Sequence, residues 1–522
     1  FRKAEKFFDV VTYTGNGVTD RQIAHNLGSV PSFVVVKSLG FSASWYVLHY
    51  DGSSWTSLVL NTTAAGSTPS GAVWGDGTTF VPPTSTDFTV ADFGSLNADT
   101  YGYVAYLFAS DAGGFGADGS ENIIKCGSYV GNGIADGPTI TLGFEPQWVM
   151  YKRINDTSDW VMQDILRGLI MDSGGKYLRA NDSSAELNAG YIQPEATGFK
   201  VRGTASTQAN ANGSTYIYIA IRMPMKTPTA GTEVFLPVGA TTTAPLWKSS
   251  FPVDMGWYRY IIGTSAGTYL GSRLTGTGRL ESSSTAVEAT DGSFIWDYMN
   301  GWFDNSFSDT NYVGYNFKRA AGFMDVVCFT GDTPNTNQRV AHNLTVAPEL
   351  IIYKGRNKVN YWRVYAGRID QYTVLNLNNA ATTWPGFWGT SAPTTTDFGF
   401  NPGLMDLDAF NGIAYLFATL AGVSKVGSYT GTGADLNVDC GFTGGARFIL
   451  IKRTDTTGDW YTYDSFRGIT AGNDPYLLLN STAAQVTGTD YVDPLNAGFT
   501  VTSSASSTVN INGGTYIFLA IA

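Results

Sequence analysis

The chain repeats itself, and this limits it to folds that are built from copies of one small unit. Residues 1–11 read FRKAEKFFDVV and residues 317–327 read FKRAAGFMDVV, so the two copies start 316 residues apart. The second copy follows a body of sequence that ends in NYVGYNF, and no such body stands before residue 1. We therefore expect the chain to be an excerpt from a longer tandem array that begins inside a module.

Two types of module alternate around a third. The motif Ala-His-Asn-Leu at 24–27 recurs at 341–344, and the motif Lys-x-Gly-Ser-Tyr at 125–129 recurs at 425–429. The first marks type A and the second type B, which gives the order A-B-C-A-B. The predicted segments are the tail of a preceding module (1–7), A1 (8–120), B1 (121–222), C (223–322), A2 (323–422) and B2 (423–522).

The periodicity indicates strands throughout. Phe8–Tyr13 and Tyr216–Ile221 are β-branched and aromatic runs of strand length, and 33–36 and 448–451 are continuous apolar runs typical of central strands. Clusters of Gly and Asn between the runs provide turns. The predicted fold class is all-β, a tandem array of about five antiparallel, jelly-roll-like β-sandwich modules of about 100 residues each. We also expect the first and last strands of each module to pair, because pairing hides sheet edges.

Composition agrees with β-rich extracellular structure. Only 14% of the 522 residues are charged and 14% are aromatic, whereas roughly 25% charged residues is typical. The net charge is −11, and the sequence has no basic stripe, which disfavours a nucleic-acid partner. Neutral partners such as glycans stay open. No run of 18 apolar residues occurs, so we expect no membrane insertion.

The cysteines and histidines do not form a chemical site in the sequence. Cys126, Cys328 and Cys440 occupy positions that the sister modules do not share, so they predict no disulfide framework and no metal site. His25 and His342 hold the same place in the two A modules. The favoured interpretation is local capping of a turn, and the alternative is a ligand or an acid/base group.

No catalytic motif stands out, and we expect no enzyme and no cofactor. A Gly-x-Ser-x-Gly elbow is missing. The carboxylate pairs Asp156/Asp159 and Asp455/Asp459 each lie in one loop, which is poor geometry for glycoside hydrolysis. Oxygen-rich loops at 304–309 and at Asp406-Leu407-Asp408 do not match a calcium motif, although structural calcium stays an alternative there.

Tryptophan recurs at one place in every A and B module, as Trp45, Trp160, Trp362 and Trp460. In the B modules an aspartate precedes it, which gives Asp159-Trp160 and Asp459-Trp460 as candidate ligand-binding residues. An exposed indole beside a carboxylate is a platform for a sugar ring. The alternative, which recurrence favours, is that the indoles pack in a core or at a module junction.

The A unit resembles a tandem β-domain of unknown function found in virion proteins of tailed phages from marine and cyanobacterial settings. The residues that carry the resemblance are Tyr13–Gly17, Ala24–Pro31, Trp45, Leu60–Ala65 and Tyr103–Ala109. In those proteins the domain often accompanies a concanavalin A-like lectin domain. The resemblance covers nearly the whole chain, but its motifs are turn and strand residues, so it carries over no catalytic residue.

What the resemblance implies is a structural or adhesive phage virion protein, a tail fibre or another host-contacting appendage at the particle surface. The implied partners are other virion proteins, further copies of the chain in a homo-oligomer, and a host-surface glycan. A capsid decoration or head-fibre protein and a secreted cell-surface adhesin stay open as alternatives.

Overall fold

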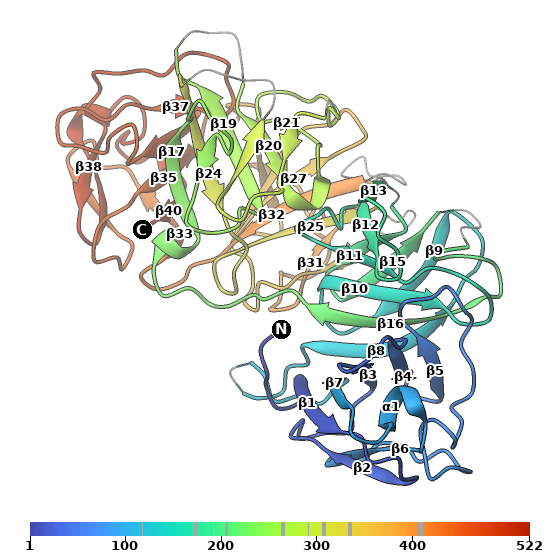
Figure 1. Ribbon diagram of the computed structural model, residues 1–522. Coiled ribbons are helices and arrows are strands. Elements are labelled where there is room, and N and C mark those ends of the chain that lie inside the picture. The colour runs from blue at the N-terminus through green and yellow to red at the C-terminus, as the bar shows by residue number, and fades with distance from the viewer. Residues whose placement is uncertain are drawn as a thin grey trace. The chain divides into compact units, whose positions relative to one another are not determined.

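The computed structural model describes residues 1–116, 118–171, 175–188, 190–203, 207–262, 267–290, 292–304, 310–331, 337–404 and 411–522. These residues form ten antiparallel sheets, in two compact units that comprise residues 1–223 and 224–522 (Figure 1). The predicted all-β fold class is confirmed. Each predicted module contains one larger and one smaller sheet, although the module boundaries themselves stay predictions.

Module A1 has a larger sheet of order β1-β7-β3-β4-β5 and a smaller sheet of β2 and β6. Its elements are β1 (Phe8–Thr14), β2 (Arg21–Ala24), β3 (Phe33–Ser38), β4 (Tyr46–Tyr50), β5 (Trp55–Val59), β6 (Asp87–Val90), α1 (Gly94–Asn97) and β7 (Gly102–Phe108). Within the described part of the chain, α1 is the only α-helix, and no helix is long and apolar enough to cross a membrane.

Module B1 has sheets of order β13-β12-β11-β10-β16-β8 and β14-β15-β9. Its strands are β8 (Ile124–Val130), β9 (Asp136–Thr141), β10 (Pro146–Arg153), β11 (Val161–Asp164), β12 (Lys176–Arg179), β13 (Leu187–Asn188), β14 (Ile192–Glu195), β15 (Gly198–Arg202) and β16 (Thr215–Arg222).

Module C has sheets of order β17-β24-β19-β20-β21 and β18-β23-β22. Its elements are η1 (Gly231–Glu233), β17 (Phe235–Gly239), β18 (Trp247–Lys248), β19 (Met255–Tyr260), β20 (Tyr269–Ser272), η2 (Arg273–Thr275), β21 (Leu280–Glu281), β22 (Phe294–Ile295), β23 (Gly301–Asp304) and β24 (Tyr312–Phe317).

Module A2 has sheets of order β25-β32-β27-β28-β29-β30 and β26-β31. Its strands are β25 (Met324–Thr330), β26 (Gln338–Ala341), β27 (Leu350–Gly355), β28 (Arg363–Ala366), β29 (Gln371–Val374), β30 (Thr382–Thr383), β31 (Asp397–Phe400) and β32 (Asn411–Phe417).

Module B2 has sheets of order β33-β40-β35-β36-β37 and β34-β39-β38. Its elements are β33 (Ser424–Thr430), β34 (Leu436–Asp439), β35 (Phe448–Arg453), β36 (Trp460–Asp464), β37 (Leu477–Leu478), β38 (Val492–Leu495), β39 (Gly498–Val501), η3 (Ser503–Ala505) and β40 (Thr515–Ile521).

All five modules share one strand pairing, in which the last strand lies between the first and the third. In A1, β7 pairs with β1 through Phe8 opposite Phe108, and with β3 through Phe33 opposite the same residue. The equivalent central strands are β16, β24, β32 and β40. The expectation that first and last strands pair is therefore confirmed. Because the last strand is central, it is paired on both sides, and the first strand forms one edge of each larger sheet.

The predicted turns depend on glycine at the expected places. Gly17, Gly133 and Gly433 follow the first strand of A1, B1 and B2, and each has a positive φ between 60° and 73°. Only glycine adopts this region at little cost, so the strand ends where the sequence predicts.

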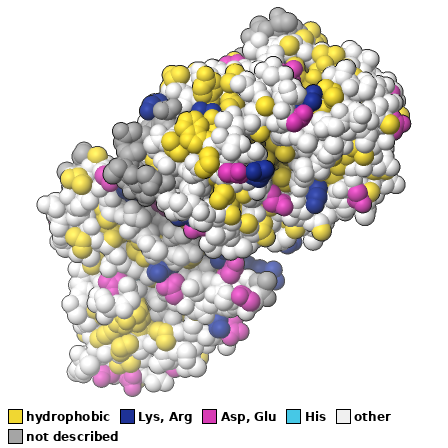
Figure 2. Space-filling view, turned by 180° about the vertical axis from the view of Figure 1, so that it is seen from behind, with side chains coloured by type: hydrophobic (Ala, Val, Ile, Leu, Met, Phe, Trp, Pro, Cys, Tyr) yellow, Lys and Arg dark blue, Asp and Glu magenta, His cyan; other side chains and the backbone are white. Residues whose placement is uncertain are grey.

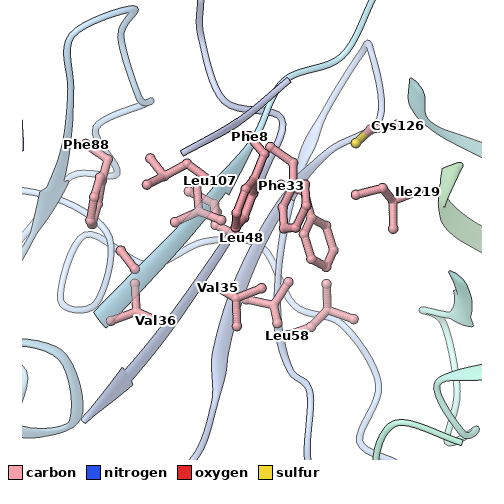
Figure 3. Packing of buried hydrophobic residues seen from close by; sticks show 14 of the residues in the cluster. Phe8, Phe33, Val35, Val36, Leu48, Leu58, Phe88, Leu107, Cys126 and Ile219 are labelled. Carbon is pink, nitrogen blue, oxygen red and sulfur yellow. The ribbon is translucent and has the colours of Figure 1, made fainter. Parts of the chain in front are cut away.

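One apolar cluster extends from the interior of A1 to residues of B1. Figure 3 shows Phe8 and Phe33 of A1 beside Cys126 and Ile219 of B1. Side chains alternate along a strand, so one face of each larger sheet packs inside its own sandwich and the other packs against the neighbouring module.

Candidate functional site

The third strand of every module carries a long basic side chain. Four of these side chains are 0% exposed, namely Lys152 of β10, Arg259 of β19, Lys354 of β27 and Lys452 of β35, whereas Lys37 of β3 is half-buried. A buried charge is costly unless polar groups surround it. The surroundings of these side chains therefore identify the most constrained positions of the molecule.

Lys452 connects its own loop to the preceding module. Its Nζ donates to the carbonyl oxygen of Gly458 in B2 at 2.5 Å and to that of Asn378 in A2 at 3.1 Å. The side chain points away from the B2 core, because its neighbour Ile451 occupies that core. Lys452 is thus an interface residue.

The same arrangement recurs at two further junctions. Lys152 Nζ donates to Ser158 O at 2.6 Å and, across the A1–B1 junction, to Thr63 O at 3.1 Å. Lys354 Nζ donates to Asn360 O at 2.9 Å and, across the C–A2 junction, to Thr285 O at 3.1 Å. Burial lowers the pKa of each of the three lysines to about 8.

The recurring tryptophan lies beside the lysine and bonds to the same neighbour. The indole N–H of Trp160 donates to Val59 O at 3.1 Å, that of Trp362 to Glu281 O at 3.0 Å, and that of Trp460 to Val374 O at 2.9 Å. Each acceptor belongs to the preceding module. The lysine and the tryptophan together form one repeated junction, which we call the Lys–Trp junction.

An asparagine of the same module fixes the tryptophan backbone. The side-chain oxygen of Asn480 accepts from Trp460 N at 2.9 Å, and that of Asn61 accepts from Trp45 N at 2.9 Å. These asparagines belong to the sequons at 61–63 and 480–482. Both asparagines thus use their side chains to bond to the backbone of their own module.

Modules C, A2 and B2 close into a ring within residues 224–522. A2 contacts C and B2 contacts A2 through Lys–Trp junctions, and C contacts B2 through Arg259. The Arg259 guanidinium donates to Ser481 O at 2.6 Å and to Ala483 O at 2.5 Å. Arginine here takes the role of the lysines, and each module contacts both others.

The centre of this ring is aromatic. The Phe448 ring of B2 lies 5.4 Å from that of Phe235, 5.5 Å from that of Tyr315 and 6.3 Å from that of Phe317, all three of module C. Such pairs stabilise a contact by about 0.5–1.5 kcal/mol beyond burial. The ring is therefore held by a packed centre and a polar rim.

Buried ion pairs complete the interfaces of the ring. Arg319 pairs with Asp325 at 2.6 Å, and Arg467 pairs with Asp464 at 2.5 Å, where all four side chains are at most 2% exposed. The hydroxyl of Tyr315 in C donates to Asp464 of B2 at 2.9 Å. Pairing and hydrogen bonding offset the desolvation of these charges.

The candidate sugar platform is occupied by protein. Trp160 and Trp460 are 1% exposed and take part in Lys–Trp junctions, so their ring faces are covered. Asp159 accepts from Asn181 Nδ2 at 2.8 Å and Asp459 accepts from Asn480 Nδ2 at 2.7 Å, which commits both carboxylates to the local turn. We therefore do not carry these four residues forward as a glycan site.

The two repeated histidines cap turns. His25 Nδ1 accepts from Leu27 N at 3.2 Å, and His342 Nδ1 accepts from Leu344 N at 3.2 Å. Burial lowers the pKa of both rings. The preferred interpretation, local capping, agrees with these bonds.

The three cysteines are buried and form no disulfide bond with one another, and burial raises the pKa of Cys126 and brings that of Cys440 to about 12. They act as small apolar residues of the interior.

The oxygen-rich loops give no metal centre in the described part of the chain, where no group of three potential ligands occurs. Asp309, Asp406 and Asp408 lie outside the described residues. Asp304 is buried and accepts from the Tyr258 hydroxyl at 3.0 Å. On the face in Figure 2, lysines and arginines are scattered among acidic and uncharged residues.

Arg259 is the interface residue that the sequence did not reveal. Lysine recurs visibly at 37, 152, 354 and 452, but module C has diverged and carries arginine at the same strand position. An alignment of Met255–Arg259 with the other third strands would have found it, because in each strand an aromatic or aliphatic residue is followed directly by a basic one.

Comparison with known proteins places these modules in a family. No curated protein matches the chain. The family profile described as a domain of unknown function (DUF7483) matches residues 3–223 and 310–522, so that each matched segment spans one A–B pair. The chain belongs to the DUF7483 family.

Proposed function

We propose that the protein is a structural and adhesive component of a tailed-phage particle, a tail fibre or another host-contacting appendage. The single observation that supports the structural role is that the recurring lysines and tryptophans bond to a neighbouring module. Lys152, Lys354, Lys452 and the paired tryptophans all hold one module against another. Residues that recur in an array for this reason serve assembly.

The tailed-phage origin is supported by the sequence resemblance given above. A β-sandwich array places its loops at the ends of rigid modules, and many copies of a weak loop contact would add up through avidity. The proposed partners are other virion proteins, further copies of the chain and a host-surface glycan. The proposed location is the particle surface.

Locating the chain in particles tests the proposal. Fab fragments raised against residues 1–522 would label purified particles of the phage that encodes the chain, and electron cryomicroscopy would locate the label. Particles that lack the gene are the control. Label along the tail or baseplate is the expected result. Label on the capsid lattice would replace the fibre by a decoration protein, and a chain found only outside particles would overturn the virion assignment.

A further inference from the structure

The first A–B pair has an apolar groove on the face that modules of the ring use to contact each other. The groove has a volume of about 410 Å³ and is lined by both A1 and B1. Trp45, Leu60 and Tyr106 of A1 line it together with Trp148 and Met162 of B1, and all five side chains are half-buried. Exposed apolar surface of this kind marks an interaction site.

Three of these residues, Trp45, Leu60 and Trp148, have completely covered counterparts in residues 224–522. Trp362 and Leu375 of A2 correspond to Trp45 and Leu60, and Phe448 of B2 corresponds to Trp148; all three counterparts are 0% exposed. Module C contacts two of them in the ring, since Trp362 donates to Glu281 O at 3.0 Å and the Phe448 ring lies 5.4 Å from that of Phe235. The groove is thus the face of an A–B pair that a C module covers.

Two donors at the rim of the groove, Lys37 Nζ and the Trp45 indole N–H, hold the positions from which their counterparts in A2 bond to module C. Lys37 Nζ donates to Ala43 O in its own loop, as the other lysines do, and lies 5.8 Å from the centre of the Trp45 ring. Lys452 lies 6.0 Å from the Trp460 ring in a complete junction. Among the described residues, Lys37 Nζ has no further acceptor and Trp45 Nε1 has none. In A2 the carbonyl oxygens of module C are the acceptors at these two positions.

On the B1 side an ion pair is formed but uncovered. Arg167 pairs with Asp164 at 2.8 Å, with side chains 41% and 17% exposed. The equivalent pair, Arg467 with Asp464, is 2% and 0% exposed, because Tyr315 of module C donates to it. Both pairs thus join an arginine to the aspartate three residues before it, but module C covers only the pair in B2.

Phe1 also lines the groove. Phe1 packs on Phe108 at 5.4 Å and on Trp148 at 6.3 Å between ring centres, as Phe317 packs on Phe417 at 6.0 Å and on Phe448 at 6.3 Å. Phe1 has the same ring contacts as Phe317, the last residue of β24. The first residues thus follow the path by which the last strand of module C enters A2.

We propose that this groove is the docking site of a further C-type module, a β-sandwich with the outer face of residues 224–316. The third module would complete a ring like that of C, A2 and B2, with an arginine equivalent to Arg259 reaching the B1 turn at 181–184, the counterpart of the B2 turn at 480–483. This inference concerns assembly alone and does not depend on the phage assignment.

The test uses the whole chain with a second copy of residues 224–316 joined directly before Phe1, which reproduces the natural Asn316–Phe317 junction. Hydrogen exchange followed by mass spectrometry would compare peptides around 43–47, 58–62 and 146–150 with those of the original chain. We expect exchange there to slow by about tenfold or more.

Two matched variants make the result specific. Arg259→Glu in the added copy alone places an acid against the carbonyl oxygens of the B1 turn. Arg259 and its neighbour Trp257 lie outside the module C core, which includes Tyr258, so the added sandwich keeps its own packing. Trp148→Glu changes the receiving side. Both variants should return the groove peptides to the exchange of the original chain.

An added copy that is protected in its own core while the groove peptides remain unchanged would overturn the proposal. Self-association of the original chain that protects the same peptides with rising concentration would assign the groove to a second copy, and would also overturn it.

Discussion

The indole nitrogen of Trp460 lies 2.9 Å from the carbonyl oxygen of Val374, a residue of the preceding module. The two residues are 86 positions apart in the chain, and the bond recurs as Trp160 with Val59 over 101 positions. The same residue type thus joins modules by donating to a backbone oxygen, whatever the side chain of the acceptor residue.

Trp460→Phe should keep an aromatic ring and remove the donor. The Val374 carbonyl then loses its partner in a buried place, and we expect the free energy of unfolding to fall by about 1–3 kcal/mol. Urea denaturation of the whole chain measures it. Trp45→Phe is the matched control, because the Trp45 indole forms no hydrogen bond within the described residues, and it should change stability by less than about 0.5 kcal/mol. Equal effects of the two variants would contradict the role of the junction.

Lys452→Met should change how stability depends on pH. Burial lowers the Lys452 pKa from 10.5 to about 8, so between these values the native state has released a proton that the unfolded state still binds. The contribution of Lys452 to stability therefore rises with pH in this window. We expect the wild type to gain about 2 kcal/mol over the variant between pH 8 and pH 10. Urea denaturation at several pH values measures the difference, and a constant difference would contradict it.

The repeats predicted the architecture because local residues determine it. Gly17 at a turn and the apolar run at 33–36 act within a few positions, so the fold class and the strand pairing could be expected from the sequence alone. Recurrence of Trp160 and Trp460 likewise favoured packing over recognition, and burial agrees with that.

The partners at the junctions could not be expected, because most acceptors are backbone carbonyls. Arg259 bonds to Ser481 O across 222 positions, and a carbonyl oxygen has no residue type by which a sequence could reveal it. The exposed groove also could not be expected, because it becomes visible only when the same face is compared in A1 and A2. Sequence patterns identify the repeated side chain but not the surface that it meets.

His49 should make the A1–B1 junction sensitive to acid. The ring is 0% exposed and its Nε2 lies 3.0 Å from Tyr218 O of B1, and burial lowers its pKa from 6.5 to about 4. As pH falls from 6.5 to 4, the unfolded state binds a proton that the native state does not, so stability is lost by about 3 kcal/mol. His49→Gln keeps a donor and cannot titrate. Urea denaturation of both chains from pH 7 to 4 should show the larger loss in the wild type, and parallel curves would contradict the assignment.

Arg259→Met should open the ring of C, A2 and B2 at one interface. The methionine keeps most of the apolar stem but leaves the carbonyl oxygens of Ser481 and Ala483 without their donors, at a cost of about 1–3 kcal/mol. Because module C stays joined to A2 through the Lys354 and Trp362 bonds, the loss should be local. We expect amide exchange in the peptides around 480–484 to rise about tenfold or more, with little change around 285–288. Arg368→Met is the control, because Arg368 pairs with Asp370 at 2.8 Å on the surface with side chains 60% and 38% exposed, and solvent screens such a pair so that it contributes little to stability. Uniformly faster exchange over all three modules would mean that Arg259 stabilises module C itself, and the ring would then need another explanation for its closure.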